Sequence, residues 1–165
     1  VLPGVFGGRV FANRGANGID GTVSTACGLA AEGRVWALVG DLALLHDAAA
    51  LRLAGEVNGR LVLVVLDNGG GHIFGHLPVA AHPEVFERYF VTPQRVDLVA
   101  LCGAHGLPVT EIADAGDWEA AREALPEQGV AVWRVRLNPA EDRGLRRLIR
   151  ERVAERLRSL QAAAQ

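Results

Sequence analysis

The stretch RLVLVVLDNGGG, residues 60–71, is the part of the sequence from which a fold can first be predicted. Residues 60–67 are rich in valine and leucine, which is typical of a strand buried on both faces of a parallel sheet. The run ends in Asp67 and Asn68 and is followed by three glycines, a composition typical of a turn. A buried strand with oxygen-bearing side chains at its end raises the question of what those oxygens bind.

A second apolar run ends in the same way. RVWALVG, residues 34–40, also reads as a buried strand, and Asp41 follows it directly. Elsewhere the hydrophobic pattern alternates between the two-residue period of a strand and the 3.6-residue period of a helix. Asp117 can be the N-cap or a first-turn acid of the helix predicted to start there. The pattern predicts further strands over 9–12, 107–112 and 129–137, and helices over 19–31, 41–57, 95–104, 117–125 and 140–162.

Strands that alternate with helices predict an α/β fold: a three-layer, doubly wound and mostly parallel sheet with helices on both faces. With no repeat and no linker, residues 1–165 are expected to form a single domain. Ligands of such folds bind beyond the carboxyl ends of the strands, where Asp41 and Asn68 lie. The last predicted helix is amphipathic, and five of its residues are expected to face inward: Leu145, Leu148, Ile149, Val153 and Leu157.

Composition narrows the class of protein. The chain has 165 residues, half of them hydrophobic, and a net charge of −2, which argues against a nucleic-acid binder. No run reaches the ~18 apolar residues that a membrane span requires. Cys27 and Cys102 are expected to be buried free thiols, which fits a reducing, cytoplasmic setting. Because the chain lacks methionine and starts at Val1, we expect a fragment or trimmed product of a longer protein.

The polar strand ends suggest a metal site. A carboxylate at Asp41, an amide oxygen at Asn68 and a backbone carbonyl from the glycine loop are ligands for Mg²⁺ or Ca²⁺ and not for zinc. The N–H groups of the helix after Gly40 could receive a phosphate, so the pattern predicts a metal-bridged diphosphate. Asp41 alone could be a helix N-cap and Asn68-Gly69 alone a turn. Two such strand ends in one chain are harder to explain structurally.

These residues also resemble a known motif. Gly40-Asp41 followed by Asp67-Asn68 is similar to the thiamine-diphosphate motif, GDG and then NN, with Leu42 and Asp67 as departures. Three longer segments resemble the C-terminal, pyrophosphate-binding domain of the 2-succinyl-5-enolpyruvyl-6-hydroxy-3-cyclohexene-1-carboxylate synthase family, which acts in menaquinone biosynthesis. They are NRGANGIDGTVSTACG (13–28), VGDLALLHDAAAL (39–51) and LVLVVLDNGGGHIFGHLP (61–78).

The resemblance implies a transferase reaction with thiamine diphosphate and Mg²⁺ or Mn²⁺ as cofactors. In that reaction 2-oxoglutarate is decarboxylated and the succinyl semialdehyde unit is added to isochorismate. It also implies two partners: an N-terminal pyrimidine-binding domain that carries the activating glutamate, and a second subunit in a homodimer or homotetramer. The chain by itself is therefore expected to be inactive.

The resemblance also assigns roles to single residues. Ile19 would support the bent cofactor, Arg14 would bind a substrate carboxylate, and Ala43 stands where a phosphate-binding hydroxyl is expected. Structural explanations compete: Ile19 could be a core residue and Arg14 an exposed loop residue. The implied metal ligands are Asp41, Asn68 and the Gly70 carbonyl; the cofactor-binding residues are Gly40, Asp41, Leu42, Ala43 and Asn68; the apolar wall beside the substrate is Ile73, Phe74 and Leu77, which could instead pack on the core.

Rival interpretations stay open. His72 and His76, with His82 beyond, have the i, i+4 spacing of a zinc-binding pair, but Gly75 and Pro78 disfavour a helix there. A nucleotide-binding module is possible on fold grounds, yet the chain lacks both a G-x-G-x-x-G turn and a Walker lysine. The chain could also belong to a different thiamine-diphosphate decarboxylase or synthase, or serve as a non-catalytic assembly module.

Overall fold

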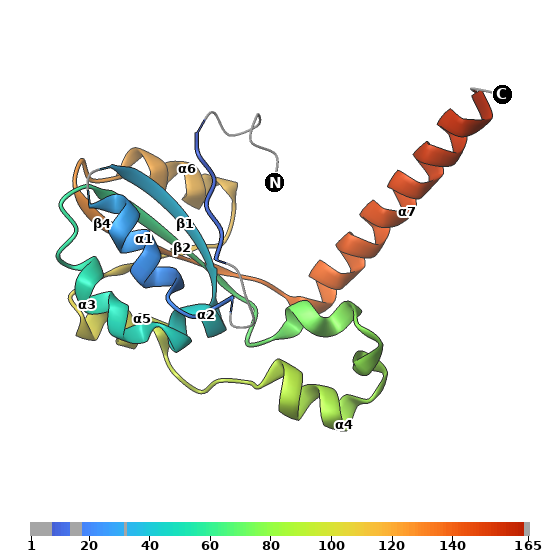
Figure 1. The fold of residues 1–165 in the computed structure, drawn as a ribbon, viewed down its shortest axis with the longest axis horizontal. Coiled ribbons are helices and arrows are strands. Elements are labelled where there is room, and N and C mark those ends of the chain that lie inside the picture. The colour runs from blue at the N-terminus through green and yellow to red at the C-terminus, as the bar shows by residue number, and fades with distance from the viewer. Residues whose placement is uncertain (1–7, 14–17, 32, 164–165) are drawn as a thin grey trace. The chain divides into compact units, whose positions relative to one another are not determined.

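The computed structural model describes residues 8–13, 18–31 and 33–163. The chain divides into two compact units, each with its own packing. The first unit is formed by Val1–Leu66 with Val96–Val135, and the second by Asp67–Arg95 with Arg136–Gln165. Figure 1 shows the order of the elements along the chain. In the described residues, no helix is both long and apolar enough to cross a membrane.

A four-stranded sheet with the order β1-β2-β4-β3 forms the centre of the first unit. The pairs β1–β2 and β3–β4 are parallel, so these strands and their order confirm the predicted fold class. The predicted strand at 9–12 is wrong: residues 9–13 are exposed coil apart from half-buried Asn13, and no described strand pairs with them. The strands are β1 (Arg34–Gly40), β2 (Arg60–Asp67), β3 (Val109–Ile112) and β4 (Gly129–Arg136).

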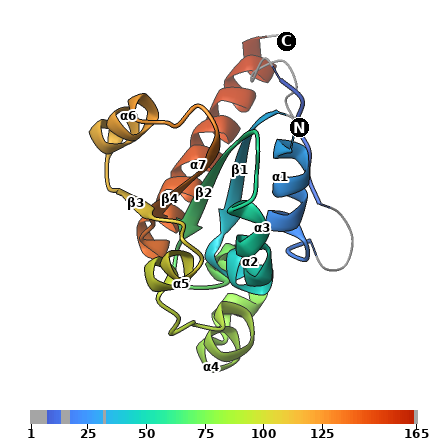
Figure 2. The same ribbon diagram turned by 90° about the vertical axis from the view of Figure 1, so that its left-hand side faces the viewer.

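The residues of β2 alternate between two hydrophobic clusters, as the two-residue period of a strand requires. Leu61, Leu63 and Val65 point into a cluster with α1 (Thr22–Ala30), α3 (Leu51–Ala54) and α5 (Leu98–Ala104). Val62 and Val64 point into the other cluster, which is covered by α6 (Ala115–Glu123). Figure 2 shows α1 and α6 on opposite sides of the sheet. This explains why the 60–67 run contains no polar face.

Three tryptophans hold the α6 face together. Trp133 is 1% exposed, and its ring meets those of Trp36 and Trp118 edge-on with centroid distances of 5.3 and 5.0 Å. Edge-to-face pairs at such distances are favourable beyond the area they bury. On the opposite face, burial raises the pKa of the Cys27 and Cys102 thiols, and both cysteines are free, as expected.

Helix α6 begins before the acid that the sequence pattern singles out. The N-cap is Asp114, whose Oδ1 accepts hydrogen bonds from the N–H groups of Gly116 and Asp117 at 2.7 and 3.0 Å. Asp117 is an acid of the first turn, the second of its two predicted roles. Its own carboxylate accepts from the Ala113 N–H at 2.9 Å, so the two acids close the β3–α6 connection from both sides.

The helix predicted over 41–57 is wrong as a continuous element. It is divided into α2 (Asp41–His46), a 3₁₀ turn (Ala48–Ala50) and α3 (Leu51–Ala54). The interruption is at Asp47, whose carboxylate accepts hydrogen bonds from the Ser24 backbone N–H at 2.7 Å and the Ser24 hydroxyl at 3.0 Å. Because α1 has a glycine at its N-cap, Asp47 supplies the cap that α1 lacks.

In the second unit, the described residues form short helical turns and one long helix. Phe86 and Val91 are buried, and Phe90 stacks on Phe86 and meets Phe74 edge-on. The expected inward stripe of α7 is wrong for this unit: its five residues, from Leu145 to Leu157, are 48–57% exposed. Among the described elements of the unit, the short η2 is the main one in contact with the helix. The elements are η2 (His72–His76), η3 (Pro78–Ala81), α4 (Pro83–Phe86), η4 (Glu87–Val91) and α7 (Pro139–Ala163).

The two-sided burial of β2 predicts that shortening a side chain on β2 destabilises the protein more than the same change on β1. Leu63→Ala removes a fully buried side chain at the centre of the sheet and should lower the free energy of unfolding by about 2–5 kcal/mol. Leu38→Ala on β1, where the side chain is 68% exposed, is the matched control and should lower it by less than about 1 kcal/mol. Urea denaturation followed by circular dichroism measures both; equal losses would contradict this account of the core.

Candidate functional site

The site begins with the register of two strands. β1 and β2 are paired along their length, and Gly40 lies opposite Leu66. Asp41 therefore follows β1 at the same edge of the sheet where β2 ends in Asp67. Parallel pairing is what brings these two strand ends to one edge. Asp41 belongs to the first unit, whereas Asn68 and Gly70 belong to the second, and each has its own surroundings.

Asp41 is the one polar or charged side chain that is buried among the described residues, with 6% of its surface exposed. It is not a helix N-cap, because Gly40 holds that position in extended conformation. Its Oδ1 accepts a hydrogen bond of 2.8 Å from the Leu42 N–H. Buried carboxylates are costly and are found mainly where they pair with other groups or coordinate metals, so burial at a strand end supports a binding role for Asp41.

Leu42 and Ala43, the next two residues of α2, do not offer a hydroxyl. Ala43 is buried in the first hydrophobic cluster, which favours a small apolar side chain there. Leu42 is partly buried and contributes its N–H to Asp41. The hydroxyl expected at this position is therefore absent, and Leu42 and Ala43 offer backbone groups instead.

The glycine loop after β2 is held in conformations that other residues rarely adopt. Gly69 and Gly70 have φ values of 80° and 135°. The Asp67 carboxylate accepts from the Gly69 N–H at 3.2 Å, an aspartate turn, and the Gly71 N–H donates to the Val91 carbonyl at 2.7 Å. A Cβ on Gly70 would clash with the Val91 carbonyl. Asp67, the departure from the expected asparagine, thus closes the turn through its carboxylate, a role that an asparagine side-chain oxygen also fills in such turns.

Asn68 has a side-chain oxygen without a partner among the described residues. Its Oδ1 is buried and, in the described part of the chain, accepts no hydrogen bond. Buried polar atoms are normally satisfied, and an exception calls for a ligand, water or ion. A neutral amide oxygen of this kind suits a hard cation such as Mg²⁺. The Nδ1 atom of His72 is also buried and unpaired among these residues, which the sequence pattern did not indicate.

Ile19 lies in a loop that side-chain hydrogen bonds keep folded. The Asn13 amide donates to the Asp20 carbonyl at 3.1 Å and to the Thr22 hydroxyl at 3.3 Å, and that hydroxyl donates to the Ile19 carbonyl at 3.1 Å. The Ile19 side chain is 41% exposed, which disagrees with a core residue and fits an apolar support for a ligand. Arg14, the expected substrate-binding arginine, lies outside the described residues.

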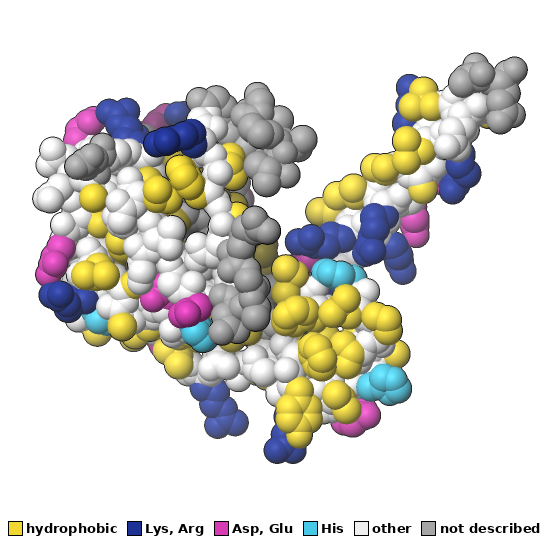
Figure 3. Space-filling view, viewed as in Figure 1, with side chains coloured by type: hydrophobic (Ala, Val, Ile, Leu, Met, Phe, Trp, Pro, Cys, Tyr) yellow, Lys and Arg dark blue, Asp and Glu magenta, His cyan; other side chains and the backbone are white. Residues whose placement is uncertain are grey.

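The expected apolar wall is on the surface of the second unit. Ile73, Phe74 and Leu77 are 61%, 41% and 42% exposed, so packing on a core does not explain them. Ile73 and Phe74 belong to η2, and the Phe74 ring rests edge-on against Phe90 at 5.9 Å. Figure 3 shows hydrophobic side chains gathered over this irregular segment. An exposed group of large apolar side chains of this kind is typical of a binding surface.

The zinc interpretation gains no support. η2 is a 3₁₀ helix, in which residues three apart align, so His72 and His76 do not share a face. Within the described ranges, no three His, Cys, Asp or Glu side chains are placed to hold a metal ion together. A site built from one carboxylate, one amide and one backbone carbonyl is of a different type and is not affected by this result.

The family model and the relatives that match the chain point to the same family. Residues 7–135 match the family model described as "Thiamine pyrophosphate enzyme, C-terminal TPP binding domain". The chain is 48% identical over 125 residues to 2-succinyl-5-enolpyruvyl-6-hydroxy-3-cyclohexene-1-carboxylate synthase of Synechococcus sp. (strain JA-3-3Ab), covering 75% of this chain and 21% of that protein. It is 43% identical to the synthase of that name in Prochlorococcus marinus (strain MIT 9313), over 94% of this chain and 27% of that protein.

Among solved structures, the crystal structure of benzoylformate decarboxylase from Polynucleobacter necessarius is similar, with a TM-score of 0.63 and 21% identity over 75% of this chain and 24% of that one. At this identity the likeness concerns the fold. The chain spans about a quarter of the length of these relatives.

The glycine loop predicts that Gly70 cannot be replaced. Gly70→Ala introduces both a strained φ and a clash with the Val91 carbonyl, and should destabilise the protein by about 1–3 kcal/mol or more. Gly69→Ala, at positive φ but with open space around the added carbon, should cost about 1 kcal/mol. Urea denaturation compares the two; a larger loss for Gly69→Ala would contradict the close packing of Gly70 on Val91.

Proposed function

Because the chain belongs to the thiamine pyrophosphate enzymes, as their C-terminal cofactor-binding domain, we propose that it is part of a 2-succinyl-5-enolpyruvyl-6-hydroxy-3-cyclohexene-1-carboxylate synthase. The proposal for the whole enzyme is that it decarboxylates 2-oxoglutarate and adds the four-carbon unit to isochorismate in menaquinone biosynthesis. The similarity to relatives of that name, at 43–48% identity over most of the chain, is the observation that supports this activity over that of other thiamine-diphosphate enzymes.

The diphosphate and metal end of the cofactor is assigned to the two strand ends. Asp41 and Asn68 would bind Mg²⁺ through side-chain oxygens, and Gly70 through its carbonyl. Burial of the Asp41 carboxylate and the unpaired buried oxygen of Asn68 support this assignment. All three donors are hard oxygens, a set that suits Mg²⁺ or Mn²⁺ with diphosphate oxygens and water completing the coordination.

In this proposal, residues of the chain hold the cofactor and orient the substrate beside it. Bound thiamine diphosphate supplies a nucleophilic carbon for the 2-oxo acid carbonyl and a sink for the electron pair left by loss of CO₂. Ile19, exposed on a loop fixed by Asn13, would support the cofactor from its apolar side. Ile73, Phe74 and Leu77 would form an apolar wall that keeps water from the reacting carbon. Arg14 would pair with a substrate carboxylate.

The remaining catalytic parts belong to the rest of the enzyme. The activating glutamate would come from the pyrimidine-binding domain, and the cofactor would lie between subunits of a homodimer or homotetramer. No described residue is suited to replace that glutamate, because the sole buried carboxylate in this part of the chain is the proposed metal ligand Asp41.

The metal assignment predicts a loss of cofactor affinity. In the intact protein, Asp41→Asn keeps the shape of the side chain but removes the charge that a divalent cation requires, and should weaken Mg²⁺-dependent binding of thiamine diphosphate at least tenfold. Glu123→Gln, at the exposed end of α6, removes the same charge far from the strand ends in sequence and is the control. Calorimetric titration measures both; unchanged affinity in Asp41→Asn would overturn the assignment.

The substrate assignment is tested by turnover. The intact protein with thiamine diphosphate and Mg²⁺ should release CO₂ from 2-oxoglutarate faster when isochorismate is present as acceptor. Phe74→Ala should lower kcat/KM for this reaction by about tenfold or more through loss of the apolar wall, while Tyr89→Ala, another exposed aromatic of the second unit, should not. Preferential turnover of an aromatic 2-oxo acid such as benzoylformate would favour a different decarboxylase.

A further inference from the structure

The first turns of α7 carry a row of arginines that the proposed function does not use. Arg143, Arg146, Arg147 and Arg150 recur at i, i+3, i+4 and i+7, which places them on one side of the helix. Like charges at these spacings destabilise a helix by a few tenths of a kcal/mol per pair. Acidic residues of the same helix offset part of this repulsion at Arg146 and Arg147.

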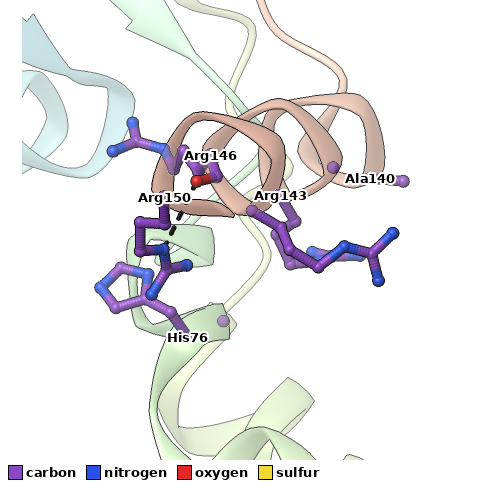
Figure 4. Close-up of a pocket in the computed structure, with 8 residues that line it drawn as sticks. His76, Ala140, Arg143, Arg146 and Arg150 are labelled. Carbon is purple, nitrogen blue, oxygen red and sulfur yellow. Dashed lines mark hydrogen bonds between the residues drawn. The ribbon is translucent and has the colours of Figure 1, made fainter. Parts of the chain in front are cut away.

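The row borders a cavity within the second unit. The cavity has a volume of about 420 Å³ and is lined by the four arginines together with Gly75 and His76 of η2. That volume is in the range of sites that bind small organic molecules. Figure 4 shows the Arg150 side chain extending toward His76, whereas the Arg143 side chain extends in another direction. The described lining therefore combines four permanent cations with a histidine and contains no carboxylate.

Contact between η2 and α7 involves one of these arginines. A Cβ added at Gly75 would lie 3.1 Å from Arg143 Cδ and 3.6 Å from one of its terminal nitrogens. The absence of a side chain at Gly75 thus lets the Arg143 side chain lie directly against the η2 backbone. This contact places the aliphatic part of the Arg143 side chain beside η2, while the residue stays exposed to solvent.

Two of the four guanidinium groups have carboxylate partners and two do not, among the described residues. Arg146 pairs with Asp142 at 2.8 Å, and Arg147 faces Glu151 at 3.9 Å. Neither Arg143 nor Arg150 has an ion pair within the described part of the chain, and the Nε–H of Arg150 donates to the Arg146 carbonyl at 3.4 Å. The N–H donors of each guanidinium lie along the edge of its plane, where two of them can bind one oxyanion together.

We propose that this cavity is a binding site for a small organic polyanion, a molecule with two or more carboxylate or phosphate groups held by Arg143 and Arg150. The size of the cavity and the number of cations favour a multiply charged ligand over a simple monoanion. Polycarboxylates and phosphate compounds share this chemistry, so citrate and inorganic phosphate serve as the two probes. None of the residues assigned to the diphosphate and metal lines this cavity.

Direct binding to the intact protein tests the proposal. Calorimetric titration with citrate and with phosphate, without metal ions and without thiamine diphosphate, should show saturable binding of at least one probe. Arg143→Gln with Arg150→Gln should weaken it at least tenfold. The control removes two charges from the same helix beyond the cavity, Arg156→Gln with Arg158→Gln, and should change it less than twofold. Tighter citrate binding would assign polycarboxylates, and tighter phosphate binding phosphate compounds.

A charge-neutral variant separates a built site from general attraction. Gly75→Ala should displace the Arg143 side chain and weaken binding severalfold without altering net charge, with unfolding by urea as the check that the fold is kept. The absence of saturable binding would overturn the proposal, as would an equal loss in the control variant. Neither cofactor nor substrate enters the measurement. A negative result would therefore leave the proposed synthase function standing, and failure of the synthase function would leave the polyanion site standing.

Discussion

The parallel pairing of β1 with β2 is the constraint on which the rest of the structure depends. Because Gly40 lies opposite Leu66, the chain leaves both strands at one edge of the sheet. Burial of β2 on two faces fixes this register, since a shift by one residue would exchange the side chains of the two hydrophobic clusters. The polar residues that follow the strands are therefore positioned by the packing of apolar ones.

The groups at the strand ends are costly to the stability of the fold. A carboxylate is buried at Asp41, an amide oxygen is buried at Asn68 without a partner among the described residues, and the glycine loop requires φ values that suit only glycine. Neighbouring residues compensate locally: Asp67 closes the turn, and Asp47 links α2 to the start of α1. Unfavourable groups held by a rigid frame are typical of binding sites.

Incorrect sequence predictions have identifiable physical causes. Residues 9–12 have the composition of a strand but no described neighbour with which to form hydrogen bonds, and a strand exists only as one of a pair. The helix over 41–57 has continuous helical periodicity, yet the Asp47 carboxylate bonds to Ser24 across the fold and interrupts it. Helix α7 has the apolar stripe that the sequence predicts, but an amphipathic pattern does not determine whether another element covers that stripe.

The sequence by itself determined the two-sided burial of β2, the parallel arrangement of the strands and the residue types at their ends, because the hydrophobic period is a local property. The burial expected of residues 34–40 is wrong, because Trp36 and Leu38 of β1 are 42% and 68% exposed. It also indicated the family through the segments around Ile19, Asp41 and Asn68. Tertiary structure alone decided that Ile19 and Phe74 are exposed, that Asn68 Oδ1 has no partner in the described residues, and that Gly75 faces Arg143. These facts depend on contacts between residues distant in the chain, and no local pattern encodes which atoms remain unsatisfied when those contacts form.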